Sequence, residues 1–162
     1  MPDAPEMAIG CVLGFDVGAK RIGVAVGNAL SGTARDLSVL DVRGGQPDWP
    51  AVQRLLAEWR PDALLVGDPR TLDGGDQPAR RRARRFADSL RQRFALPVHL
   101  VDERSSSVEA ARRFAAGRAA GTRRRGDADR LDALAAAVIV ERWLAAPTDP
   151  IPSSTDPDAS PR

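Results

Sequence analysis

Residue types that build many common active sites are almost absent from this chain. Its 162 residues include one cysteine, Cys11, and one histidine, His99. A single cysteine excludes an internal disulfide and a cysteine-built zinc site, and a single histidine excludes a histidine-rich metal site. Any metal ion would therefore have to be held by oxygen atoms. We expect His99 to be a packed strand residue rather than a general base.

Long apolar segments are also missing. The longest uninterrupted apolar run, Ala133 to Val140, is far shorter than the roughly 20 residues that span a bilayer. The first residues lack the basic and then apolar pattern of a signal peptide. With 43% apolar and 28% charged residues, the sequence predicts a globular domain with no membrane partner, and we expect a cytoplasmic location.

Charge is unevenly distributed, although the net charge is only +2. Both ends of the chain are acidic and the middle is basic. Lys20 is the only lysine among 24 basic residues, and the arginine guanidinium group suits bidentate phosphate contacts. A general composition bias toward arginine would produce the same numbers, so the charge favours a nucleic-acid partner without selecting it.

Hydrophobic periodicity predicts an α/β domain. We expect strands at 9–15, 22–26, 36–42, 63–66 and 98–101, and helices at 49–59, 77–94, 108–116 and 129–145. The first three strands are predicted to pair antiparallel, and the later strand–helix–strand order implies a parallel crossover. The result is a mixed five-stranded sheet with helices on both faces.

The predicted boundaries divide the chain into a flexible N-terminus at 1–8, one domain at 9–145 and a disordered tail at 146–162. The tail is rich in proline, serine and aspartate, which is typical of disorder. Within the domain, the loop that begins at Gly67 and runs to Gly75 is expected to be exposed.

Three acidic residues lie at the ends of predicted core elements. Asp16 closes the first strand, Glu103 follows the last strand, and Asp132 lies near the start of the last helix. Since an unpaired buried charge is costly, each carboxylate needs a partner. Carboxylates without cysteine or histidine suit Mg²⁺ or Mn²⁺, and two such ions about 4 Å apart activate water for phosphodiester cleavage.

Each acid also has an ordinary structural explanation. Asp16 could cap a hairpin turn, and Glu103 could be a polar strand end. Asp132 could be favoured by the helix dipole, one turn after an N-cap at Asp129. Because adjacent strand residues point to opposite faces, only one of Asp102 and Glu103 can face such a site.

Basic residues supply a predicted nucleic-acid surface. Some lie on one edge of the long helix, some in the loop before the last helix, and some beside the acids. They are Lys20, Arg21, Arg80, Arg84, Arg104, Arg123, Arg124 and Arg125. A solvated helix face explains the helical arginines as well. No aromatic stacking pattern accompanies them, so recognition would rest on the nucleic-acid backbone and shape.

Five short motifs occur in order along the chain. They are Phe15-Asp16-Val17-Gly18-Ala19-Lys20-Arg21-Ile22-Gly23-Val24-Ala25, Val66-Gly67-Asp68-Pro69, Asp73-Gly74, Asp102-Glu103-Arg104 and Leu131-Asp132-Ala133-Leu134-Ala135-Ala136. In order and spacing they resemble the YqgF (RuvX) family, whose members are assigned as nucleases of precursor 16S rRNA and are related to RuvC-type Holliday junction resolvases. The likeness runs from Ile9 to Leu144.

This resemblance implies an RNase H-like fold in which Asp16, Glu103 and Asp132 are catalytic, metal-binding acids and Asp129 is an additional metal ligand. It implies an endonuclease that uses Mg²⁺ or Mn²⁺ in 5′-end maturation of precursor 16S rRNA. The expected partner is precursor 16S rRNA or another structured nucleic acid, which could be part of a ribosomal particle, and the expected state is a monomer or a homodimer. The chain departs from the family at Asp68, where an apolar residue is usual.

Other functions stay open at this stage. The related Holliday junction resolvases imply DNA cleavage as an alternative, and the acids could be structural in a non-catalytic RNA-binding assembly factor. Asp16-Val17-Gly18 with Gly23 also resembles the phosphate-binding hairpin of actin-like ATPases. Those enzymes close two such domains over the nucleotide, and this chain has the length of one.

Overall fold

The computed structural model describes residues 10–69, 77–102, 112, 115 and 127–152. The predicted flexible N-terminus and the tail beyond residue 152 lie outside these ranges. Of the predicted helix 108–116 the structure describes only positions 112 and 115, both of them helical.

Six strands form one mixed sheet in the order β4-β3-β2-β1-β5-β6. They are β1 (Cys11–Val17), β2 (Arg21–Asn28), β3 (Thr33–Arg43), β4 (Gln46–Pro47), β5 (Ala63–Asp68) and β6 (Val98–Asp102). β2 pairs antiparallel with β1 and β3, and β5 pairs parallel with β1 and β6. The predicted strands and their antiparallel start are confirmed. The two-residue β4 was not predicted, because it is too short to show an alternation.

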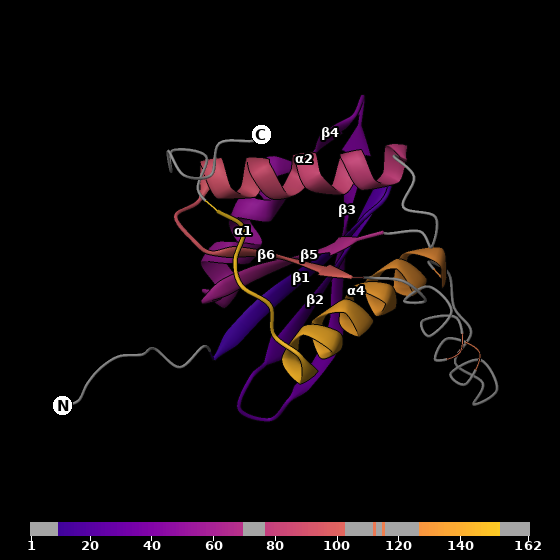
Figure 1. The fold of residues 1–162 in the computed structure, drawn as a ribbon. Coiled ribbons are helices and arrows are strands. Elements are labelled where there is room, and N and C mark those ends of the chain that lie inside the picture. The colour runs from indigo at the N-terminus through magenta and orange to yellow at the C-terminus, as the bar shows by residue number, and fades with distance from the viewer. Residues whose placement is uncertain (1–9, 70–76, 103–111, 113–114, 116–126, 153–162) are drawn as a thin grey trace.

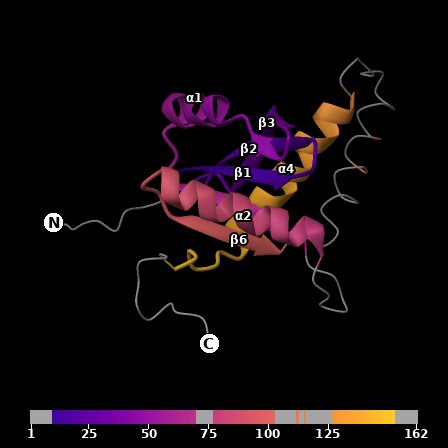
Figure 2. The same cartoon turned by 90° about the horizontal axis from the view of Figure 1, so that it is seen from above.

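Helices cover both faces of this sheet, as predicted (Figure 1). They are α1 (Trp49–Trp59), α2 (Pro78–Arg93) and α4 (Asp127–Ala145). Val52 of α1 and Phe86 of α2 share one buried cluster, whereas Ile139 of α4 belongs to a second cluster on the opposite face. Seen from above, α4 runs diagonally across β1 and β2 (Figure 2). No helix in the described ranges has the length and apolar character needed to cross a bilayer.

Strand alternation decides which side chains of β1 face which helices. Leu13 and Phe15 belong to the cluster of α1 and α2, whereas Val12 belongs to the cluster of α4. A Cβ added to Gly14 would lie 2.3 Å from Val140 of α4. Because residues two apart in a strand share a face, Asp16 lies on the α4 face.

Residues 146–152 run along β6 and extend the folded unit beyond the predicted boundary at residue 145. The Ile151 amide donates to the Val98 carbonyl at 2.8 Å, and the Thr148 hydroxyl donates to the Leu100 carbonyl at 3.3 Å. These contacts cover a sheet edge, which would otherwise present unpaired backbone groups. His99 is buried, 2.8 Å from the Thr148 carbonyl through Nδ1, and is a packed strand residue as expected.

Candidate active site at the end of β1

The position opposite Asp16 has no side chain. In the antiparallel pair of β1 and β2, Asp16 is the register partner of Gly23. Directly opposed residues in such a pair have Cβ positions about 5 Å apart and point to the same face. Gly23 therefore places no Cβ beside Asp16 on the face that α4 covers.

The helix α4 approaches the sheet at this position. A Cβ added to Gly23 would lie 2.0 Å from the Asp132 carbonyl oxygen and 2.9 Å from the Ala133 nitrogen. Real Cβ atoms do not come this close, so only glycine allows the backbone of α4 to rest here. The fold thus brings the backbone of Asp132, from an element far away in the sequence, against the register partner of Asp16.

Arg21 of β2 forms an ion pair with Asp132 of α4. Its Nε donates to Oδ2 of Asp132 at 2.6 Å and lies 3.6 Å from Oδ1 of Asp129. The hydrogen bond to Asp132 and the negative charges of Asp132 and Asp129 raise the pKa of Arg21 above its usual value. A permanent cation therefore stands between β2 and the start of α4.

The predicted metal ligands differ in their placement. Asp16 and Asp132 share one face of the sheet, and Asp129 is exposed but reaches the same cation, Arg21. Glu103 lies outside the described residues, as do Arg104, Arg123, Arg124 and Arg125. Within the described ranges, no group of three or more metal-ligating side chains is assembled. The metal-binding roles therefore stay predictions.

Asp102 and Cys11 are not part of this candidate site. Asp102 is the register partner of Asp68, and it shares the α2 face with Val98 and Leu100 of the same strand. Cys11 lies at the other end of β1, where burial, together with the negative charge of Asp62, raises the pKa of its thiol. A neutral thiol at that distance is not a ligand for this site.

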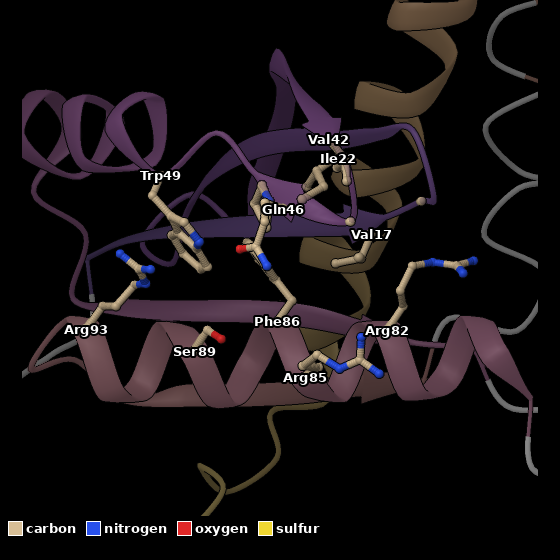
Figure 3. A pocket seen from close by; sticks show the side chains of 13 residues that line it. Val17, Ile22, Val42, Gln46, Trp49, Arg82, Arg85, Phe86, Ser89 and Arg93 are labelled. Carbon is tan, nitrogen blue, oxygen red and sulfur yellow. The ribbon is translucent and has the colours of Figure 1, made fainter.

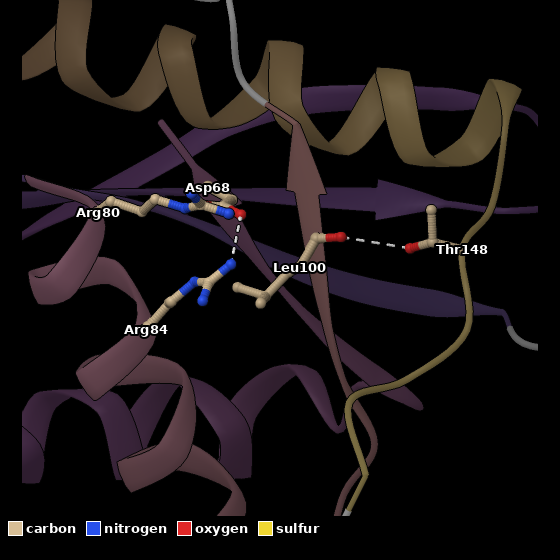
Figure 4. A network of polar contacts seen from close by, with 5 residues as sticks. All are labelled: Asp68, Arg80, Arg84, Leu100 and Thr148. Carbon is tan, nitrogen blue, oxygen red and sulfur yellow. Dashed lines mark hydrogen bonds and ion pairs between the residues drawn. The ribbon is translucent and has the colours of Figure 1, made fainter. Parts of the chain in front are cut away.

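The prediction of an exposed loop that begins at Gly67 is wrong for its first two residues. Gly67 and Asp68 continue β5, and Asp68 is only 1% exposed. Its carboxylate lies 3.1 Å from Nε of Arg80 and 3.6 Å from a terminal nitrogen of Arg84, both on α2 (Figure 4). The sequence predicts a loop from Gly67 onward because Asp68-Pro69 is a strong turn signal. The phosphate contacts predicted for Arg80 and Arg84 stay predictions.

Replacing Asp68 with alanine is expected to lower the free energy of unfolding by about 2–3 kcal/mol, because a buried acceptor of two arginines is lost. Urea unfolding measures this change. Asp88→Ala is the matched control, since Asp88 pairs with Arg91 at the surface, where such pairs contribute less than about 1 kcal/mol. Equal losses in the two variants would show that Asp68 does not anchor α2.

Sequence reasoning missed another group of arginines on α2. Arg82, Arg85 and Arg93 line a pocket together with Phe86 and Ser89. The signal was available, because these positions recur at helical spacing of three or four residues around the buried Phe86.

The sequence is similar to that of known proteins over most of its length. The family model described as RuvX, Holliday junction resolvase, matches residues 10–146. A protein of Xanthomonas axonopodis pv. citri, provisionally named pre-16S rRNA nuclease, is 66% identical over 91% of this chain and 96% of its own. A Xanthomonas campestris pv. campestris protein with the same name is 66% identical over 84% and 88%.

The fold also has a counterpart among solved structures. Thermus thermophilus RuvC in complex with a Holliday junction substrate superposes with a TM-score of 0.51 at 20% identity, covering 88% of this chain and 99% of RuvC. This likeness supports the predicted RNase H-like fold.

Proposed function

Because this chain belongs to the RuvX family, we propose that it is a metal-dependent endonuclease that cleaves phosphodiester bonds in 5′-end maturation of precursor 16S rRNA. The observation that carries the proposal is the convergence of Asp16 and Asp132 on one face of the sheet, at the bare position of Gly23. The name of the relatives at 66% identity supports the choice of rRNA.

The donor set fits Mg²⁺ or Mn²⁺. Asp16 and Asp132 offer carboxylate oxygens, and the two softer side chains are elsewhere: Cys11 at the far end of β1 and His99 packed against Trp143. We propose that Glu103 completes the set and that Asp129 assists. Bound divalent ions would activate a water and stabilise the leaving oxygen.

Basic residues would hold the nucleic-acid backbone around these acids. Lys20 is exposed in the turn between β1 and β2, and Arg21 follows it in the chain. Arginine forks suit phosphate oxygens, so we propose that both residues contact the backbone near the cut. The proposed setting is the cytoplasm, on precursor rRNA or ribosomal particles, with the chain as a monomer or homodimer.

Holliday junction cleavage is the second candidate. The description of the family model and the likeness to RuvC favour it. Acid-bound metal ions cleave RNA and DNA by the same chemistry, so the substrate has to be established by direct comparison.

The test offers the purified protein a precursor 16S rRNA 5′ fragment and a DNA four-way junction, each with Mn²⁺, Mg²⁺ or a chelator. We expect metal-dependent cleavage of the RNA and an intact junction. Cleavage of the junction alone would establish the resolvase instead. Binding of the RNA without cleavage in any metal would favour a non-catalytic assembly factor.

Replacing Arg21 with glutamine is expected to tighten Mn²⁺ binding about tenfold in the absence of nucleic acid. The reason is that a positive charge 2.6 Å from the Asp132 carboxylate, which would compete with a divalent cation, is removed. Calorimetric titration measures the affinity. Arg21→Lys, which keeps the charge, should bind Mn²⁺ like the unmodified protein; equal affinity of the glutamine variant would contradict the account.

A further inference from the structure

A second candidate site lies on the opposite face of the sheet from the acids. A pocket of about 120 Å³ opens between α2 and the strands β1 to β4. Figure 3 shows α2 as one wall, with Val17, Ile22 and Val42 facing it. Phe86 projects from α2 into the same space, so apolar side chains form one wall of a pocket that Gln46 and Ser89 also line.

The rim of this pocket is positively charged. Arg82, Arg85 and Arg93 line it, and no acidic residue does. In the part of the chain that the structure describes, Arg82 Nε is buried and has no hydrogen-bond partner. A buried donor without a partner is costly, so the site favours a ligand that brings an acceptor.

One of these arginines is already held against an aromatic ring. The Arg93 guanidinium lies 4.1 Å from the Trp49 ring centroid, and Trp49 stacks on Phe86 at 5.4 Å. This stack closes one end of the pocket (Figure 3). Arg82 and Arg85 line the rest of the rim and are the arginines available to bind an anion.

Size and charge together indicate the ligand class. Pockets for complete small molecules measure roughly 300–1,000 Å³, so this one suits a single group of a larger ligand. An apolar wall beside polar groups and an arginine rim matches a flat base attached to a phosphate, because guanidinium groups pair with phosphate and stack on bases.

The pocket and the candidate active site lie at the same end of β1. Val17 and Gly18 line the pocket and directly follow Asp16, whose side chain faces α4. Neighbouring strand residues point to opposite faces, so the two sites lie back to back at the same end of β1. A strand that passes over this end would reach both.

We propose that this pocket is a subsite for one unpaired nucleotide of the strand that is cut at the acids. The base enters against Phe86 and Val17, and Arg82 and Arg85 hold its phosphate. This proposal depends on the proposed function, because the ligand of the subsite is taken to be the RNA that the nuclease cleaves. It adds a contact that selects single-stranded RNA beside the cut.

The first test measures binding without cleavage, so it is independent of catalysis. The probe is fluorescein-labelled single-stranded RNA from the 5′ region of precursor 16S rRNA, with a chelator present. Arg82→Gln/Arg85→Gln is expected to weaken binding about tenfold and to lower the salt slope by about 0.7, which corresponds to one neutralised phosphate on a single strand. The control, Arg43→Gln/Arg54→Gln, removes two exposed charges outside the pocket and should change binding less than twofold.

The second test locates the base. In a series of RNAs that each lack one base, one position is expected to bind about tenfold more weakly than the intact RNA. Ser89→Trp fills the pocket, so this variant should bind the intact RNA weakly and should not respond to the missing base. Thermal unfolding checks that each variant is folded.

Three results would overturn the subsite. The double arginine variant could bind within twofold of the unmodified protein, or no single missing base could matter. Adenosine monophosphate could also bind as tightly as the RNA, which would make the pocket a site for a free nucleotide. If the binding results hold and no substrate is cleaved, the subsite stands and the nuclease proposal fails.

Discussion

Replacing Asp16 with asparagine is expected to reduce cleavage of precursor 16S rRNA by about 1,000-fold or more. The substitution keeps the size of the side chain and removes the negative charge that would hold a divalent ion. Such an ion contributes several kcal/mol to the stabilisation of the transition state, and each 1.4 kcal/mol is a factor of ten in rate. Single-turnover cleavage at saturating protein measures the loss directly.

The control for Asp16→Asn is Glu58→Gln, which removes one negative charge from the exposed side of α1. This variant should cleave at the normal rate, because Glu58 lies far along the chain from both acids and on a helix of the other face. The asparagine variant should also keep its RNA affinity and its unfolding midpoint. Full activity of Asp16→Asn would show that this carboxylate does not take part in the chemistry.

Replacing Gly23 with alanine is expected to destabilise the fold by about 3 kcal/mol. The new Cβ would lie 2.0 Å from the Asp132 carbonyl oxygen, and this neighbour is helix backbone that cannot rotate away. The helix α4 must shift, and Asp132 moves with it. Since a displacement of about 1 Å in a catalytic group costs roughly 100-fold in rate, cleavage should fall by at least that factor.

Urea unfolding and the cleavage assay together test the Gly23 prediction. Gly10→Ala is the matched control, because its added Cβ would make an ordinary contact, 3.5 Å from the Asp62 carboxylate. We expect this control to lie within about 0.5 kcal/mol of the unmodified protein and to be fully active. A Gly23→Ala protein of normal stability and activity would mean that α4 does not rest on this position.

Sequence periodicity captured most of the fold for a simple physical reason. The strands β1 and β5 are apolar and largely buried, and α2 shows an apolar stripe through Ala83, Phe86 and Leu90, so pattern and burial agree. The predicted end of β5 was wrong because Asp68 is a charged residue that is nevertheless buried in the strand. Its burial depends on Arg80, twelve residues later, and no local pattern reports a partner at that distance.

The candidate site was predictable only in part. Strand alternation puts Asp16 on the face of Val12 and Gly14, and helical spacing aligns Asp132 with Ala136 and Ile139, so the face of each acid can be deduced from the sequence. Their proximity depends on Gly23, whose importance appears only when the backbone of α4 lies against it. The pairing of Arg21 with Asp132 was not predicted, because spacing alone does not distinguish a phosphate contact from an ion pair.

The most direct test of the central claim follows Mn²⁺ by nuclear magnetic resonance. Paramagnetic Mn²⁺ broadens the amide signals of nearby residues, so a substoichiometric addition identifies its site. We predict selective broadening at Asp16, Gly23 and Asp132, and its loss in the Asp16→Asn/Asp132→Asn variant. Broadening that spares these three residues, or that persists in the double variant, would contradict a metal site at the end of β1.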